Sequence, residues 1–125
     1  MEVQPNKTDW LARNGRDLFL YLTTTGRRSG RPHRIEIWFA AHRGKVYLLS
    51  GGRDRSDWVQ NLQANGHVNV ELGGEHHVGM ARVLQPGTAE DQLARELLVV
   101  KYEPVEHDSL EEWGRTSLPV VIEFD

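Results

Sequence analysis

Apolar and polar residues alternate over several short segments of this chain, with the period of two residues that is typical of β-strands. Segments that favour strands, most of them with this pattern, lie at residues 18–25, 33–41, 46–49, 68–72, 76–84 and 118–124. Only four residues separate the second segment from the third, and Gly73 and Gly74 lie between the fourth and the fifth. Connections this short permit hairpins but no parallel crossover, so the pattern predicts a mainly antiparallel sheet.

Two of these segments carry more specific expectations. The segment at 18–25 begins with an almost continuous apolar run, which predicts a strand buried on both faces. The segment at 33–41 is expected to form one unbroken strand. Its inward side chains would be Ile35, Ile37 and Phe39. Trp38 would then point outward, toward solvent, a pocket or a partner.

Helical signals occur in two longer segments and in one or two short ones. Residues 57–65 follow a serine that suits an N-cap, and residues 88–102 form the second long segment, which Pro104 is expected to end. In that second helix the side chains expected to face the sheet are Leu93, Leu97, Leu98 and Val100, and those expected in solvent are Glu90, Asp91 and Glu96. One or two helical turns are also expected before Gly15, and a surface turn or short helix at 106–112. The sequence predicts two or three helices.

The overall composition fits a soluble protein. With 125 residues, of which 38% are hydrophobic and 26% charged, the chain is expected to form one domain over residues 1–125. Residues 1–8 show no apolar period and are expected to be flexible. The absence of a long apolar run and of a signal-peptide pattern favours a cytoplasmic protein without a membrane segment. With no cysteine, the chain cannot form disulfides, thiolate nucleophiles or cysteine-ligated metal sites.

The charges are distributed unevenly along the chain. Residues 1–55 contain eleven Lys or Arg and five Asp or Glu, whereas residues 56–125 contain four and thirteen. The net charge is nevertheless −3. A basic region inside an acidic protein favours a localised small anion over a nucleic acid, which usually needs a broad basic face.

The basic residues are concentrated in the stretch TTTGRRSGRPHR at residues 23–34. The β-branched threonines suit a strand, and Gly26 and Gly30 permit the positive φ angles of a tight turn. The turn and its exit carry Arg27, Arg28, Ser29, Arg31 and Arg34. Backbone N–H groups of a turn and guanidinium groups together bind phosphate oxygens, so the stretch predicts an anion-binding loop. A solvated basic hairpin is the alternative that this stretch alone leaves open.

A second glycine-containing stretch follows the segment at 46–49. Ser50, Gly51 and Gly52 expose backbone that no bulky side chain covers. A flat ring could lie directly against this main chain, whose N–H groups can donate to ring carbonyls. An ordinary glycine turn is the alternative.

Other kinds of chemistry find little support. His76 and His77 are adjacent and would point to opposite faces of a strand, and the remaining histidines lack the spacing of a zinc site, so no metal is expected. Neither Ser29 nor Ser50 lies in a G-x-S-x-G turn. Hydride transfer needs no acid–base pair from the protein, so it is compatible with a sequence that identifies no catalytic residue.

The order of these features resembles the deazaflavin-dependent nitroreductase family, relatives of the FMN-binding split barrels of the pyridoxamine-phosphate-oxidase type. The resemblance covers residues 18–124 and rests on TTTGRRSGRP, a Gly-Lys hairpin, YLLSGG, DWVQNLQAN and a V-x-V strand. It implies a mainly β, α+β fold, a split β-barrel of six or seven antiparallel strands. It also implies a homodimer, which would cover open strand edges and faces such as Trp38.

The resemblance further implies an oxidoreductase that passes a hydride from a reduced deazaflavin, coenzyme F-420, to a quinone, nitroaromatic or similar electron-poor acceptor. The implied cofactor-binding residues are Arg27, Arg28, Ser29, Gly30, His33, Arg34, Ser50, Gly51, Gly52, Trp58 and Asn61. The expected acceptor pocket comprises Trp38, Tyr102 and Trp113. The several carboxylates in the tail of a deazaflavin could pair with the arginines of 26–34, whereas FMN needs fewer of them. An FMN enzyme of the same fold and a non-catalytic carrier of the cofactor or of another small anion remain alternatives.

Overall fold

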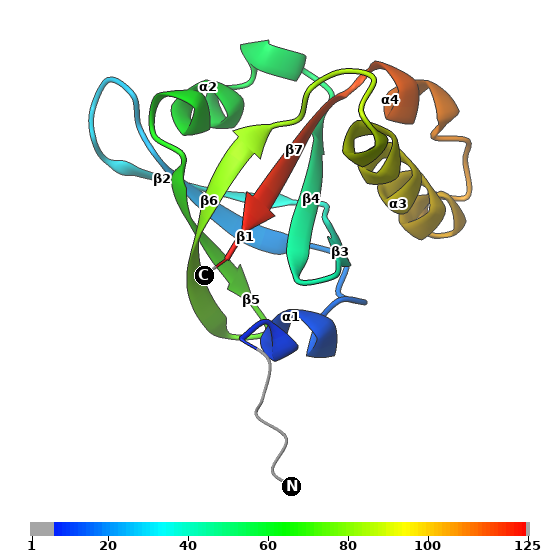
Figure 1. Ribbon diagram of the computed structural model, residues 1–125, viewed down its shortest axis with the longest axis horizontal. Helices are drawn as coiled ribbons and strands as arrows, with labels where there is room; N and C mark the ends of the chain where they lie inside the picture. Colours follow the sequence, from blue (N-terminus) through cyan, green and yellow to red (C-terminus); the bar gives the residue numbers. More distant parts are fainter. Residues whose placement is uncertain (1–6, 125) are drawn as a thin grey trace, which may run out of the picture.

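The computed structural model describes residues 7–124, which form one curled antiparallel sheet with helices around it (Figure 1). The strands are β1 (Leu20–Thr25), β2 (Pro32–Ile37), β3 (Ala40–His42), β4 (Lys45–Ser50), β5 (His67–Leu72), β6 (Glu75–Val83) and β7 (Leu118–Glu123). Their order across the sheet is β2-β1-β5-β6-β7-β4-β3, and every neighbouring pair is antiparallel. The curled half-barrel confirms the predicted split-barrel fold. The predicted flexibility of residues 1–8 falls mostly outside the described residues.

The helices are more numerous than the two or three expected. They are α1 (Asp9–Arg13), the 3-10 helix η1 (Arg53–Arg55), α2 (Asp57–Ala64), α3 (Ala89–Glu106) and α4 (Glu111–Thr116). In Figure 1, α2 and η1 lie at the top, α3 and α4 beside β4, and α1 at the bottom. The extra helices are only one or two turns long, so tertiary contacts rather than a periodic pattern hold them. None of the helices in residues 7–124 is long and apolar enough to cross a bilayer.

The hydrophobic core has two parts on opposite faces of β4. The part inside the barrel includes Leu22, Leu48 and Ile122, all fully buried. The second part lies between α3 and the outer face of the sheet, and includes Tyr47 and Leu98. Because side chains alternate along a strand, β4 is buried on both faces, whereas β1 alternates between buried and partly exposed positions.

The structure corrects the expected strands in two places. The segment at 33–41 is broken: β2 ends at Ile37 and β3 begins at Ala40, because these strands form opposite edges of the sheet and the chain must cross between them. The segment at 18–25 forms a shorter strand than expected, and β1 alternates between buried and partly exposed positions instead of being buried on both faces. Leu18 and Phe19 are 45% and 43% exposed, because β1 pairs with β2 only from Leu20 onward.

The structure also corrects the orientation and the end of α3. Leu98 is buried on the sheet side, and Leu93 and Leu97 pack against the same core, as expected. Val100 instead points away and is 73% exposed, and Ala94 and Tyr102 complete the buried face. Asp91 is buried rather than solvated, since it accepts hydrogen bonds from Arg95 Nε at 3.1 Å and from the Gly87 N–H at 3.2 Å. Pro104 does not end α3, which continues to Glu106. The helix loses only one backbone hydrogen bond at this proline, near its C-terminus.

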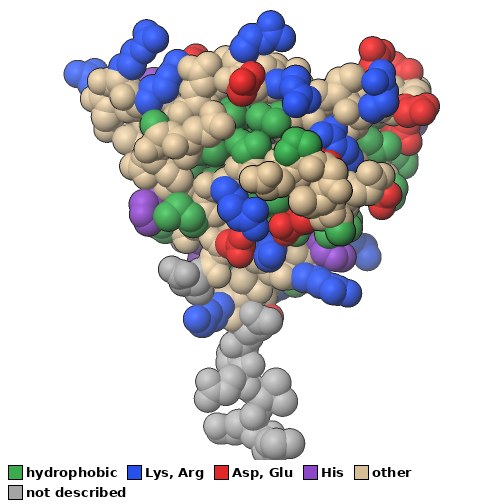
Figure 2. All heavy atoms as spheres, turned by 45° about the horizontal axis from the view of Figure 1, so that its top comes forward, with side chains coloured by type: hydrophobic (Ala, Val, Ile, Leu, Met, Phe, Trp, Pro, Cys, Tyr) green, Lys and Arg blue, Asp and Glu red, His purple; other side chains and the backbone are tan. Residues whose placement is uncertain are grey.

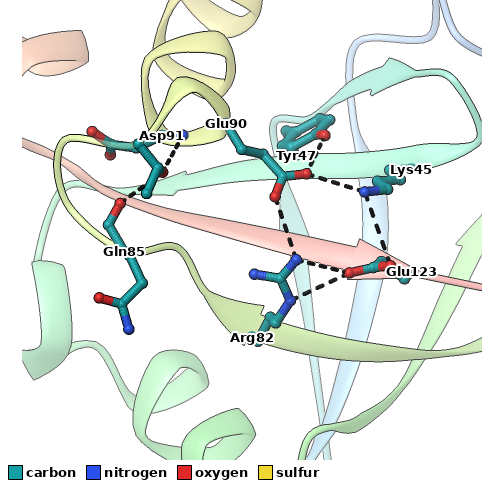
Figure 3. Close-up of polar contacts among 8 residues, drawn as sticks. Lys45, Tyr47, Arg82, Gln85, Glu90, Asp91 and Glu123 are labelled. Carbon is teal, nitrogen blue, oxygen red and sulfur yellow. Dashed lines mark hydrogen bonds and ion pairs between the residues drawn. The ribbon is translucent and has the colours of Figure 1, made fainter.

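The beginning of α3 is fixed to the sheet by a network of charged side chains (Figure 3). Glu90 accepts hydrogen bonds from the Tyr47 hydroxyl at 2.7 Å and from Lys45 Nζ at 3.2 Å. Arg82 joins Glu90 to Glu123, at 3.3 Å and 2.9 Å. The hydrogen bond from Tyr47 is the main cause that lowers the pKa of Glu90, and burial raises the pKa of Tyr47. The network contains two cations and two carboxylates, so it positions α3 without adding net charge.

Candidate cofactor site

The basic loop between β1 and β2 is a tight, internally bonded turn. The Gly26 N–H donates to the Arg31 carbonyl and the Gly30 N–H to the Gly26 carbonyl, both at 2.8 Å. Gly30 has the expected positive φ of 70°. Gly26 does not, but a Cβ there would lie 2.5 Å from His33 Nε2 and 2.6 Å from Ser29 Oγ, so a larger residue would displace these two side chains. Gly30 thus supplies the backbone conformation of the turn, and Gly26 leaves room for the His33 and Ser29 side chains.

The loop is anchored by one buried amide of α2. Asn61, which is 2% exposed, accepts hydrogen bonds through Oδ1 from the Arg27 backbone N–H at 3.2 Å and from Arg27 Nη1 at 2.9 Å. Its Nδ2 donates to Thr24 Oγ1 at 3.1 Å. Arg27 also bonds Asp57 at 3.2 Å. Asn61 and Arg27 therefore organise the loop, and the Arg27 guanidinium is already bonded to Asn61 and Asp57.

The tip of the loop keeps its donors available. Among residues 7–124, the backbone N–H groups of Arg28 and Ser29 donate no hydrogen bond, and the exposed Arg28 guanidinium forms no ion pair. Ser29 Oγ accepts from the Arg31 N–H at 3.1 Å, which leaves its hydroxyl proton free to donate. These groups border a hollow of about 250 Å³, which is also lined by His33, Asp57 and Asn61. This donor set fits a phosphate or carboxylate.

Arg34 does not join the other predicted residues at the loop. His33 and Arg34 are adjacent on β2 and point to opposite faces of the sheet. Arg34 pairs with Glu71 at 2.8 Å, and its guanidinium lies 3.7 Å from the centre of the Tyr21 ring. The structure therefore places His33, but not Arg34, with the predicted anion loop.

The predicted ring-facing stretch lies at the end of β4. The Ser50 hydroxyl is buried, and it contacts the Arg53 carbonyl at 2.9 Å and Ser56 Oγ at 2.8 Å. Gly51 and Gly52 are exposed, and the Gly52 carbonyl accepts a hydrogen bond from the Arg55 N–H at 3.1 Å. A Cβ on Gly51 would lie 3.5 Å from Trp113 Nε1, so this turn adjoins the α4 tryptophan. Trp58 packs against the inner core, partly buried, and does not line the hollow at the basic loop.

Two of the three residues expected for the acceptor pocket line one cavity. This cavity, called here the aromatic slot, has a volume of about 330 Å³ and is lined by Phe19, Glu36, Ile37, Trp38, Leu49 and Trp113. The rings of Trp38 and Trp113 lie 5.6 Å apart at an angle of 80°. The assignment of Tyr102 to the pocket was wrong. Tyr102 is 1% exposed and lies behind Trp38 rather than in the slot.

No pattern in the sequence points to the other residues that line the slot. Phe19 precedes β1, Glu36 belongs to β2 and Leu49 to β4, so no sequence spacing links them. The only available signal was the aromatic character of Phe19, which the apolar run at 18–25 assigned to the core.

Lys and Arg side chains lie along the upper edge of the molecule in Figure 2, whereas acidic side chains gather at the upper right, over α3 and α4.

Comparisons with known proteins identify a family and several solved structures of the same fold. The family described as F420H(2)-dependent quinone reductase matches residues 7–125. The solved structure of an F420-H2 dependent reductase, FDR-A, has a TM-score of 0.69 and 24% identity, over 86% of this chain and 95% of that chain. A structure described as a domain-swapped dimer has a TM-score of 0.68 and 22% identity, over 94% and 100%. An FAD-binding protein from Mesorhizobium loti has a TM-score of 0.68 and 15% identity, over 97% and 89%. These structures share the fold.

Proposed function

Because the chain belongs to the F420H(2)-dependent quinone reductase family, we propose that it passes a hydride from a reduced deazaflavin to a quinone, nitroaromatic or similar electron-poor acceptor. Membership of this family makes the protein an oxidoreductase whose cofactor is the deazaflavin coenzyme F-420. When bound, the reduced coenzyme supplies the hydride, and the acceptor takes it up together with a proton from water. The protein has to hold the coenzyme, admit the acceptor and limit the access of water.

The observation that carries the proposal is the set of unused donors at the tip of the basic loop. Arg28 and Ser29 offer two backbone N–H groups, a hydroxyl and a guanidinium to the same hollow. Each charge-assisted hydrogen bond contributes about 1.5–3 kcal/mol. Two or three of them would supply much of the roughly 8 kcal/mol that micromolar binding of the coenzyme phosphate requires.

The acidic tail of the coenzyme would use a smaller set of arginines than the sequence suggested. Arg27 is bonded to Asn61 and Asp57, and Arg34 is paired on the other face of the sheet. The remaining exposed arginines of the loop are Arg28 and Arg31. We therefore assign phosphate and tail carboxylates to Arg28 and Arg31, with Arg27 as the residue that holds the loop.

The ring of the coenzyme would lie against the open backbone of Gly51 and Gly52, beside the aromatic slot. Trp113 links the two, because it approaches Gly51 and also forms a wall of the slot. An acceptor ring in the slot would be held by stacking and apolar contact with Trp38 and Trp113, which also keep water away. No side chain is assigned as a general acid or base, since the hydride comes from the coenzyme.

The assembly and location that we propose are a homodimer in the cytoplasm. Strand β6 presents Val78 and Met80, which are 66% and 48% exposed, on the surface. Two large apolar side chains on one strand favour coverage by a second copy of the chain. A domain-swapped dimer also occurs among the structures of this fold.

The experiment that tests the function is a titration of the purified protein with reduced coenzyme F-420 and, separately, with FMN, followed by addition of menadione. Micromolar binding and oxidation of the deazaflavin, with weaker binding of FMN, are expected. Arg28→Ala should raise the dissociation constant for the deazaflavin at least tenfold, a loss of about 1.4 kcal/mol, without unfolding the protein. Arg115→Ala, which removes the same charge from an exposed position of α4, is the matched control. An unchanged dissociation constant for Arg28→Ala would contradict the anion loop, and binding without oxidation would indicate a carrier.

A further inference from the structure

The aromatic slot lies at the split of the barrel. Strand β3 pairs with β4 only from Ala40–Tyr47 to His42–Lys45, so the last residues of β4 continue beside β7 alone. At this point the chain has left β2 at Ile37 and crosses through Trp38 and Phe39 to β3. The slot is therefore an opening that the strand topology requires, and aromatic side chains form its walls.

The wall formed by Trp38 is fixed from behind by α3. The Tyr102 hydroxyl lies 2.7 Å from the Leu18 carbonyl and accepts a hydrogen bond from the Phe39 N–H at 2.9 Å. Lys101 Nζ donates to the Phe39 carbonyl at 2.8 Å and to the Asp17 carbonyl at 2.6 Å. These bonds hold the backbone on both sides of the slot, so its shape is formed before any ligand enters.

The charge of the slot comes from one residue. Glu36 is the only charged residue among the six that line the slot. Its carboxylate forms no ion pair among residues 7–124, and the nearby Arg34 is paired with Glu71 instead. The register places Glu36 opposite Tyr21, on the face of the sheet that also carries Arg34. The slot is thus apolar and aromatic, with one carboxylate at its border that forms no ion pair among residues 7–124.

We propose that the slot accepts flat aromatic acceptors that are uncharged or positively charged, and that Glu36 disfavours acceptors carrying a sulfonate or carboxylate. The inference rests on the proposed function, because it specifies the acceptor class of the same site. Glu36 is exposed, so its effect is partly screened by solvent. We therefore expect a discrimination of about two- to fivefold, in the range that exposed charge pairs produce.

The test compares two quinones of the same ring system that differ in charge. Quenching of tryptophan fluorescence in the coenzyme-free protein would give dissociation constants for menadione and for 1,4-naphthoquinone-2-sulfonate. The wild-type protein should bind menadione about two- to fivefold more tightly, and Glu36→Gln should reduce this ratio toward one by strengthening the binding of the sulfonate. High salt should have the same effect on the wild-type protein, since it screens the carboxylate.

Glu112→Gln is the matched control, because Glu112 is exposed, adjoins Trp113 in sequence and does not line the slot. It should leave the ratio unchanged. Trp113→Phe should weaken the quenching of tryptophan fluorescence by menadione, because Trp113 lines the slot. A weaker signal in this variant would show that the quenching comes from binding in the slot. Equal affinity of the wild-type protein for both quinones, an unchanged ratio in Glu36→Gln, or no quenching by either quinone would each overturn the proposal. Failure of the proposed function appears separately, as absence of coenzyme F-420 binding in the titration of the basic loop.

Discussion

The indole ring of Trp38 lies flat on the phenol ring of Tyr102, with 4.3 Å between the ring centres and 3° between the ring planes. Tyr102 is fully buried, whereas Trp38 is half-buried and lines the aromatic slot. One face of Trp38 is therefore used by the core, and its remaining surface borders the slot. This pair connects the stability of the fold with the shape of the proposed acceptor site.

Removing the hydroxyl of Tyr102 should loosen this connection. Tyr102→Phe keeps the stacked ring but leaves the Phe39 N–H and the Leu18 carbonyl without their partner. We expect a loss of about 1–3 kcal/mol in the free energy of unfolding, measured with urea, and a higher KM for menadione. Tyr21→Phe is the control, since the Tyr21 hydroxyl forms no hydrogen bond among residues 7–124. A stable variant with unchanged KM would show that Tyr102 does not position Trp38.

Removing the amide of Asn61 should disorganise the basic loop. Asn61→Ala removes the acceptor of the Arg27 N–H and guanidinium and the donor to Thr24. The dissociation constant for coenzyme F-420 should rise at least tenfold, and the free energy of unfolding should fall by about 1–3 kcal/mol. Gln63→Ala, at an exposed position of the same helix, should change neither quantity. Wild-type coenzyme affinity in Asn61→Ala would mean that the loop does not bind the phosphate.

A methyl group on Gly51 tests the position of the coenzyme ring. It would lie 3.5 Å from Trp113 Nε1, which is an ordinary contact, and Gly51 has no positive φ. Gly51→Ala should therefore keep the thermal stability of the protein but raise the dissociation constant for coenzyme F-420, because the methyl group separates the ring from the backbone. Gly15→Ala, whose added Cβ would lie 3.4 Å from the Leu11 carbonyl, serves as a tolerated control. If both variants bind the coenzyme equally well, the ring lies elsewhere.

The pH dependence of stability should carry a contribution from Lys101. Burial lowers the pKa of Lys101 to about 8, from the 10.5 expected in the unfolded chain. Between these values the unfolded chain binds more protons at this site, so the Lys101 contribution to the free energy of unfolding increases as the pH rises from about 8 toward 10.5. Burial raises the pKa of Tyr102 to about 12, which keeps its phenol protonated over this range.

The measurement compares urea unfolding of the wild-type protein and Lys101→Met at several pH values. The free energy of the wild-type protein relative to the variant should increase above pH 8 and be constant well below it. A difference that stays constant at all of these pH values would show that Lys101 titrates as a solvated amine. A difference that decreases with pH would show that its hydrogen bonds favour the charged form.

The sequence was sufficient to predict those properties that depend on residues close to one another in the chain. Apolar runs and the period of two residues located the strands, apart from the break within 33–41, and short connections required antiparallel pairs, as the sheet shows. The basic loop could also be recognised, because Gly26, Gly30 and the arginines between them are consecutive. Its turn geometry depends on local steric and hydrogen-bond requirements that the loop residues themselves carry.

Only the tertiary structure decided which of these residues meet. The Phe39 N–H and the Tyr102 hydroxyl are 63 positions apart, and their bond turns a residue expected in the acceptor pocket into a support behind it. Asn61 likewise reaches Arg27 across 34 positions. Strand order across the curled sheet places Phe19, Glu36 and Leu49 around one slot. Such contacts depend on how the sheet curls and on the orientation of α3 against it. No local pattern in the sequence determines the curl of the sheet or the orientation of the helix.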